Sequence, residues 1–343
     1  MSPRVLIPAA VLALLAALFA FRASAKMPDF EVYWRAGARA LAAEPLYRDA
    51  DEHYQLKYLP AFAILAIPAG LLPLTPAKML WFVASSGLIA VLLGFSLRLL
   101  PERRKPAWVL VAVTFVAMAK FYGHELILGQ VNLLFAVIIV SAVLLLEQRR
   151  SALAAAAGGV AVALVIPAVI YGVQGAVDLH REWWRTVTGS TAPNLLNPDN
   201  VSLAAMFAKW IGPGLPAAWL TAALSLVLLA SAALVVRRRR EVSSAAGLEA
   251  ALLLMLIPLL SPQGWDYVFL IATPAIVFFV NHDLALPRAL RAATWLALVL
   301  AGFSLFDIMG RAAYGRFMAW SVVSVCFLVL VAALATIRAR RGA

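Results

Sequence analysis

An acidic and aromatic cluster, from Asp29 to Trp34, closely follows an apolar stretch that runs from Val5 to Phe21. A carboxylate at a membrane boundary is costly unless it faces water or a partner, and such residues are often functional. The cluster opens a polar segment that reaches Tyr58. Asp29 stands where a helix is expected to start, and the helix dipole keeps a carboxylate ionised at that position. We interpret the segment as half of an active site, with Asp29 as a group able to accept a proton.

The composition defines the class of protein. Of the 343 residues, 64% are hydrophobic and 13% are charged, a balance that excludes a soluble globular protein. A span needs about 20 mostly apolar residues, and the chain offers roughly ten such stretches. Backbone hydrogen bonding in lipid makes these stretches helices. We predict an all-α, polytopic transmembrane protein with about ten to eleven membrane segments. Residues 1–343 are expected to form a single domain.

The basic residues orient the chain. The formal net charge of +12 comes largely from short blocks between apolar stretches, which matches the positive-inside rule and not a nucleic-acid-binding surface. The blocks assigned to the cytoplasm are residues 98–105, 149–150, 237–240, 288–291 and 338–341. The polar loops left for the outer face are residues 22–58, 123–130, 174–214, 261–267 and 307–317. Cys326 is the only cysteine, so the sequence has no disulfide framework.

Two apolar stretches do not read as simple spans. Val5 to Phe21 precedes small residues at Ala23 to Ala25 that resemble a signal-peptide cleavage site, but many spans follow, and we favour a retained anchor. Leu59 to Leu74 is short and rich in proline. We predict that it is a broken or re-entrant segment, which is tolerated where protein or a water-filled cavity surrounds it.

The first outer loop, residues 22–58, contains a predicted helix. Phe30 to Leu41 alternates apolar and polar residues at helical spacing, which is typical of an amphipathic helix at a membrane interface. A surface helix without a catalytic role explains the aromatic residues equally well. It explains less well why Asp29 stands at the start of the helix.

The motifs of the chain, taken in order, resemble a known family. They are Asp29 to Leu41, Pro45 to Tyr47, Lys57 to Pro60, Gly129 to Asn132, Asn200 to Leu203, and Leu260 to Pro262 with Trp265. This set is similar to glycosyltransferase family 87, the polyprenyl-phosphate-mannose-dependent mannosyltransferases of the GT-C class. Family members usually carry a further apolar hairpin after the block equivalent to Arg149-Arg150. Some also have histidine after the tryptophan, where this chain has Asp266.

The resemblance implies a membrane glycosyltransferase that moves a hexose, mannose in the family, from a polyprenyl phosphate to a lipid or glycan hydroxyl. A lipid phosphate is a good leaving group, so the reaction mainly needs a base for the acceptor hydroxyl and cations for the phosphate. Asp29 matches the aspartate taken as the base in relatives, and attack from the far face inverts the anomeric carbon. The implied location is the cytoplasmic (inner) membrane, with the active site facing the periplasm or exterior.

The polar loops supply the remaining candidate residues. Those for the donor phosphate are Lys57, Tyr58, Lys120, His124, Arg181 and Arg185. Those for the acceptor or sugar are Glu31, Tyr33, Glu125, Gln130, Asn132, Asn200, Trp265 and Asp266. Simpler explanations stay open: Lys120 can snorkel, Gln130 and Asn132 can cap a helix, and the Trp183-Trp184 pair in loop 174–214 can anchor the arginines beside it at the membrane.

No metal or other cofactor is expected, since the four histidines show no ligand spacing. Two alternative functions are kept. A transporter or lipid flippase also uses broken segments, but it predicts charges within spans and internal repeats, and the sequence shows neither clearly. An inactive relative predicts that Asp29→Asn has no measurable effect.

Overall fold

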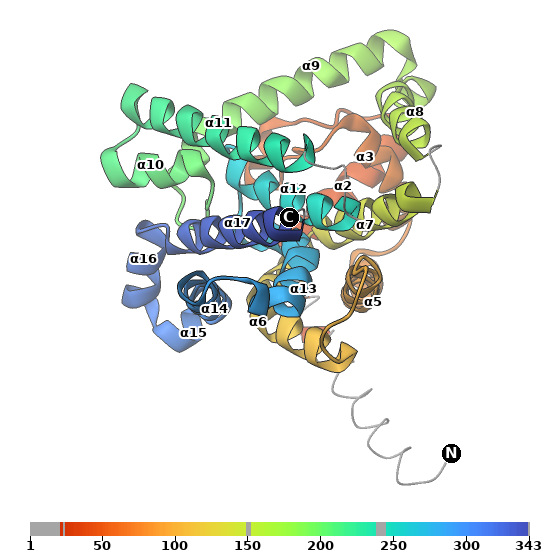
Figure 1. The fold of residues 1–343 in the computed structure, drawn as a ribbon. Helices are drawn as coiled ribbons and strands as arrows, with labels where there is room; N and C mark the ends of the chain where they lie inside the picture. Colours follow the sequence, from red (N-terminus) through yellow and green to blue (C-terminus); the bar gives the residue numbers. More distant parts are fainter. Residues whose placement is uncertain (1–20, 23–24, 149–151, 238–244, 342–343) are drawn as a thin grey trace. The chain divides into compact units, whose positions relative to one another are not determined.

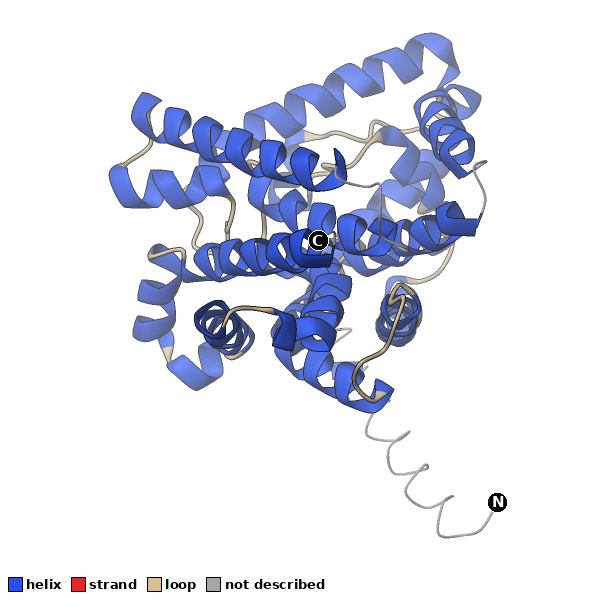
Figure 2. Cartoon of the chain, viewed as in Figure 1, coloured by secondary structure: helices blue, strands red, loops and turns tan. Residues whose placement is uncertain are grey.

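The computed structural model describes residues 21–22, 25–148, 152–237 and 245–341, so the apolar stretch Val5–Phe21 lies almost entirely outside the described residues. Within the described ranges the chain is helical and has no strands, which confirms the all-α prediction (Figure 2). The one β-type contact there is an isolated antiparallel bridge between Asn200 and Trp265.

The described residues include five helical segments that are long and apolar enough to cross a membrane. They are α5 (Leu74–Arg98), α6 (Ala107–Leu128), α11 (Leu215–Arg237), the segment Asp266–Ala285 and α17 (Val322–Arg341). A sixth is added if α8 (Ala152–Val165) and α9 (Ala168–Asn194), which meet at a bend of 84°, form one broken span. These segments support a multi-pass membrane protein, whereas the predicted ten to eleven segments are not confirmed.

The remaining elements are shorter. They are α2 (Pro28–Leu41), η1 (Asp49–Tyr54), α3 (Pro60–Leu65), α4 (Ile67–Gly70), α7 (Asn132–Gln148), α10 (Leu203–Ile211), α12 (Ala245–Leu260), α14 (Arg288–Gly302), α15 (Phe306–Met309) and α16 (Arg311–Ala319) (Figure 1). The segment Asp266–Ala285 is itself made of η3 (Asp266–Ala272), α13 (Thr273–His282) and η4 (Asp283–Ala285). The chain divides into two compact units. Unit 1 comprises Met1–Leu88, His124–Val131 and Ala154–Gly189, and unit 2 comprises Ile89–Gly123, Asn132–Leu153 and Ser190–Ala343.

Unit 1 is organised around α2, which packs closely against α3 and α4. The predicted helix from Phe30 to Leu41 forms within α2, and its buried residues recur at helical spacing. Glycine makes the close approach possible, because a Cβ on Gly37 would clash with the carbonyl of Ala66 and one on Gly70 would lie 2.5 Å from the backbone nitrogen of Ala38. The proline-rich segment that follows is broken into α3 and α4, as predicted.

Unit 2 has a core built by α12, α13, α14 and α17. Every residue of α13 is buried. Phe269 and Phe327 stack in this core with ring centroids 3.5 Å apart. This core contains a buried ion pair: Arg338 lies 3.1 Å from Glu249, and both side chains are almost fully buried. Because these two charges are partners, burial leaves neither of them as an isolated ion.

Candidate active site

Asp29 is hydrogen-bonded to a residue from a distant part of the sequence. It is the second residue of α2, directly after Pro28. The Nε2 atom of Gln130 donates a hydrogen bond of 2.6 Å to its Oδ2 atom. The Oε1 atom of Gln130 accepts hydrogen bonds from the hydroxyls of Tyr33, at 2.8 Å, and Tyr58, at 3.2 Å. Four of the predicted site residues therefore meet in unit 1.

The two tyrosines determine how the Gln130 amide is oriented. A tyrosine hydroxyl has one proton to donate, and both hydroxyls lie against the carbonyl oxygen of the amide. The amide nitrogen, which only donates, must then face Asp29. A carboxylate that receives this hydrogen bond on Oδ2 is stabilised in its ionised form. The arrangement favours Asp29 as a proton acceptor, which is the state a general base requires.

A glycine turn brings Gln130 to Asp29. Helix α6 ends at Leu128, and Gly129 follows with φ of 73°, in the left-handed region that glycine enters without strain. The backbone N–H groups of Gly129 and Gln130 both bond to the carbonyl of Glu125, at 2.9 and 3.0 Å. A Cβ on Gly129 would lie only 2.7 Å from the Cβ of Phe30. The Gly129-Gln130 pair is thus required by a tight turn packed directly on α2.

Tyr58 is protonated at neutral pH, as an ordinary tyrosine is, and burial extends this to higher pH. Burial raises the pKa of Tyr58 above its ordinary value, and the nearby carboxylates Glu125 and Asp29 raise the pKa further, while the hydrogen bond with Tyr33 opposes the shift. The hydroxyls of Tyr33 and Tyr58 lie 3.0 Å apart. A neutral Tyr58 is able to donate to Gln130, so the pKa shift agrees with the hydrogen-bond geometry.

Lys57 is a cation whose pKa is affected by the Asp29 carboxylate. Desolvation lowers the pKa of Lys57, and the attraction of the Asp29 carboxylate opposes that shift. Lys57 is nevertheless exposed as a residue, so a ligand can approach it from outside. The indole of Trp183 donates to the backbone carbonyl of Lys57 at 3.2 Å and ties this segment to α9.

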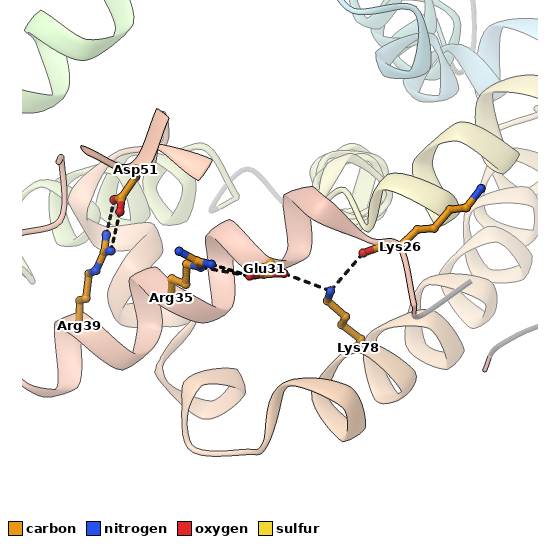
Figure 3. Close-up of polar contacts among 6 residues, drawn as sticks. All are labelled: Lys26, Glu31, Arg35, Arg39, Asp51 and Lys78. Atoms are coloured by element: carbon orange, nitrogen blue, oxygen red, sulfur yellow. Dashed lines mark hydrogen bonds and ion pairs between the residues drawn. The ribbon is translucent and has the colours of Figure 1, made fainter. Parts of the chain in front are cut away.

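Glu31 lies on a different side of α2 from Asp29, because residues two apart on a helix point in different directions. Its Oε1 atom accepts from Arg35 at 2.7 Å, and Lys78 donates to its Oε2 atom at 3.3 Å (Figure 3). Burial acts to raise the pKa of Glu31, but the hydrogen bonds from Arg35 and Lys78 outweigh it and lower the pKa overall. Lys78 also donates to the carbonyl of Lys26, so Glu31 helps to hold the chain that enters α2.

The first loop contains an Asp-x-Asp sequence, Asp49-Ala50-Asp51, that sequence reasoning passed over. Arg39 binds both carboxylate oxygens of Asp51, at 2.5 and 2.7 Å (Figure 3). Asp49 accepts instead from Gln55 at 3.1 Å. The described residues contain no group of three or more His, Cys, Asp or Glu side chains arranged to hold a metal ion.

Unit 2 contains a second polar cluster around Lys120, whose side chain is 0% exposed. Its ammonium lies 3.2 Å from Asp266, whose side chain is 1% exposed, and donates to the hydroxyl of Ser304 at 2.9 Å. The ring of Tyr314 covers the ammonium, with 5.4 Å between Nζ and the ring centroid. The predicted residues Lys120 and Asp266 are therefore partners of each other within the protein.

Asn200 and Trp265 belong to the same part of unit 2. The side-chain amide of Asn200 donates hydrogen bonds to the backbone carbonyls of Asn194 and Pro262 and accepts one from the backbone N–H of Ser202. Asn200 is fully buried. The N–H of Val201 bonds to the carbonyl of Gly264. These bonds join the Asn200 stretch to the turn before Trp265. The Asn-Val-Ser sequence is an N-glycosylation sequon, but a buried and bonded amide is not accessible to modification.

The other predicted residues lie on α6, α7 and α9. His124 and Glu125 are in the last turns of α6, where His124 is half-buried and Glu125 is buried. Asn132 is the first residue of α7. Arg181 and Arg185 lie on α9, and both are exposed.

Sequence reasoning missed several residues that organise these clusters. Trp81 donates to the backbone carbonyls of Gly129 and Gln130, at 3.1 and 3.2 Å, and stacks on Phe30. Ser304 and Tyr314 complete the surroundings of Lys120. Tyr314 lies in the polar loop 307–317, but Trp81 and Ser304 stand in no polar loop or motif. The available signal was weak: Trp81 lies in a long apolar stretch where a tryptophan normally indicates only packing.

Comparison with known proteins adds the family. No curated protein and no solved structure was found to match the chain. The model of glycosyltransferase family 87 matches residues 56–189 and 139–262, which together make up more than half of the chain. The matched region includes Lys57, Tyr58 and Gln130 and starts after Asp29. The chain therefore belongs to glycosyltransferase family 87.

Proposed function

We propose that this membrane glycosyltransferase moves a hexose, most simply mannose, from a polyprenyl phosphate to a hydroxyl of a lipid or glycan, with Asp29 as the general base. The observation that supports the base is the hydrogen bond from Gln130 to Asp29, which is oriented by Tyr33 and Tyr58. The polyprenyl donor and mannose are taken from the family resemblance described above.

The reaction is a single displacement at the anomeric carbon. The acceptor oxygen forms a bond to that carbon while its proton passes to Asp29, and the bond to the phosphate oxygen breaks with its electron pair leaving on the phosphate. Attack on the face opposite the leaving group inverts the configuration. Proton transfer to a positioned carboxylate is worth about 10²- to 10⁴-fold in rate.

The neighbours of Asp29 have separate tasks in this proposal. Gln130 acts as a positioning residue, because it bonds to Asp29 and not to the reacting atoms. The Lys57 ammonium is close enough to be affected by Asp29, and it supplies positive charge for the departing phosphate. We place the reaction on the periplasmic or exterior side of the cytoplasmic membrane, in accord with the assignment of the arginine blocks to the cytoplasm.

The test is transfer of radiolabelled mannose from synthetic polyprenyl-phosphate-mannose by the purified full-length protein, with a lipid extract as acceptor. Wild type should form labelled product, and Asp29→Asn should lower the rate by about 10²-fold or more. Asparagine can still accept a hydrogen bond from Gln130 through its side-chain oxygen, so the local geometry is preserved.

Asp49→Asn is the matched control. It removes one carboxylate from the same loop, at an exposed position that bonds to Gln55. We expect it to leave transfer unchanged. Equal transfer by wild type and Asp29→Asn would remove Asp29 from the mechanism. No transfer by wild type would argue for the transporter or inactive-relative alternative.

A further inference from the structure

The junction of α8 and α9 forms a hollow that the proposed reaction does not use. Its volume is about 530 Å³. We call this site the α8–α9 elbow, and its lining residues are Leu164, Val177, His180, Arg181, Trp184 and Arg185. All six lie in unit 1, so the elbow is a feature of one compact unit.

The five lining residues of α9 form one helix face. They occur at positions 177, 180, 181, 184 and 185, which is the i, i+3, i+4, i+7, i+8 spacing of a single stripe. The stripe combines two arginines with a valine and a tryptophan. Such a mixture is typical of a helix that lies at the boundary between lipid headgroups and acyl chains.

The two helices have the orientation and composition that such a boundary requires. Helix α8 is apolar, and its own side chains Val160, Val162 and Val165 are each at least 60% exposed. Helix α9 leaves it at 84°. If the apolar α8 enters the bilayer, α9 runs along the surface, and the elbow lies where an acyl chain meets its headgroup.

The charges of the elbow favour an anion. Arg181 forms an ion pair with Asp178, at 3.0 Å. Arg185, in contrast, forms no ion pair with an acidic side chain of the described residues. The lining side chains, counted together with Asp178, therefore keep a net positive charge. His180 bonds through Nδ1 to the carbonyl of Ala176 at 2.7 Å, and its buried Nε2 has no hydrogen-bond partner in the described part of the chain.

We propose that the α8–α9 elbow binds an anionic membrane phospholipid. The phosphate lies between Arg181 and Arg185, a headgroup polar atom bonds to His180 Nε2, and an acyl chain packs on Leu164, Val177 and Trp184. The bilayer itself supplies this ligand, because the site opens on an exposed apolar surface and its arginine and tryptophan side chains are largely exposed. A phospholipid in the elbow would anchor α9, whose Trp183 binds the Lys57 carbonyl, to the membrane surface.

Native mass spectrometry of the full-length protein tests the site without requiring transfer activity. The detergent-solubilised protein is mixed with phosphatidylglycerol or phosphatidylcholine of identical acyl chains. We expect phosphatidylglycerol to be retained at least about tenfold better, since each arginine near the surface contributes to anionic-lipid binding. Equal retention of the two lipids would overturn the proposal.

Three variants assign the preference to the elbow. Arg181→Gln with Arg185→Gln should abolish the preference for phosphatidylglycerol, while Arg181→Lys with Arg185→Lys should retain most of it. The matched control, Arg311→Gln with Arg316→Gln, removes the same charge from exposed positions of α16 and should bind as wild type does. A preference that survives the elbow glutamines, or that the α16 glutamines remove, contradicts the site.

A competition experiment separates a phospholipid from the sugar-donor lipid. An equimolar amount of polyprenyl phosphate should leave phosphatidylglycerol bound to the elbow. Displacement that depends on Arg181 and Arg185 would instead assign the two arginines to the donor phosphate, and the phospholipid proposal would be wrong. Because only binding is measured, a failure of the transferase proposal does not affect this result.

Discussion

Replacing Gln130 by glutamate should change the pH dependence of transfer in a direction that the structure fixes. Glutamate has the shape of glutamine and can still accept from Tyr33 and Tyr58, so the hydrogen bonds at Oε1 are kept. The change is confined to the atom that faces Asp29. A donor N–H at 2.6 Å from the Asp29 carboxylate becomes a carboxylate oxygen. Two carboxylates at this distance cannot both be ionised without repulsion, so they share a proton and the upper pKa of the pair rises.

The size of this shift follows from Coulomb's law. Each charge is spread over two oxygens, so the charge centres are about 4 Å apart, and at an effective dielectric constant of about 20 their repulsion is about 4 kcal/mol, or roughly three pKa units. Asp29 is half-buried, and solvent screening reduces this value. We expect a rise of about one to two units. The hydrogen bonds from Tyr33 and Tyr58 favour the ionised form of the introduced glutamate, so the shared proton lies mainly on Asp29. Asp29 is then fully available as a base only above the raised pKa of the pair, and activity is lost at low pH and recovered as the pH increases.

The assay is the initial rate of mannose transfer, expressed as kcat/KM for the acceptor, measured from pH 5 to pH 9. The acidic limb of the profile for Gln130→Glu should lie about one to two units above that of wild type. Gln55→Glu is the matched control, because it also replaces an amide that donates to an aspartate, Asp49 at 3.1 Å, but outside the cluster. Coinciding profiles for wild type and Gln130→Glu would refute the assignment of Asp29 as the base.

Three further predictions concern neighbouring residues. Lys120→Met should leave Asp266 buried without its cation, which lowers the free energy of unfolding by about 3–5 kcal/mol and lowers the Tm in detergent. Adding Asp266→Leu should restore most of this loss. An unchanged Tm for the single variant would contradict the ion pair. Gly129→Ala should lower transfer at least about tenfold, because its Cβ strikes Phe30 and displaces Gln130, whereas Gly310→Ala, at the same φ of 73° but in open space, should keep full activity. Lys57→Gln should raise the KM for the donor about tenfold and leave the KM for the acceptor unchanged. Because burial lowers the Lys57 pKa, the lysine loses its charge, and wild-type donor binding weakens, at a pH below the ordinary lysine value of about 10.4. A donor KM that neither the substitution nor the pH change affects would exclude Lys57 as a phosphate ligand.

The helix from Phe30 to Leu41 and the break after Pro60 were predictable because both depend on local sequence. Apolar spacing specifies a helix face, and prolines interrupt a helix wherever it lies. The choice of Asp29 as a candidate rested on the same kind of signal, a carboxylate at a helix start near an apolar stretch. The number of membrane segments was less predictable, since 153–173 reads as one apolar stretch and yet divides between α8 and α9.

The roles of Gln130, Lys120 and Trp81 depend on packing and had no local signal. Gln130 was a candidate sugar ligand or helix cap, but its partners lie in the first loop. Lys120 was a candidate phosphate ligand, and the structure pairs it with Asp266 inside unit 2. Trp81 was not singled out, because its contacts are with backbone carbonyls of a distant turn.

The sequence alone determined that the chain is a helical membrane protein of glycosyltransferase type, because composition, apolar periodicity and ordered motifs are properties of the linear chain. Only the tertiary structure decided which groups meet. Asp29 and Gln130 are 101 positions apart, and the Gly129 turn, the packing of α2 and the two tyrosines together bring the amide to the carboxylate. Such contacts depend on the combined packing of several segments, and no spacing rule within one segment encodes them.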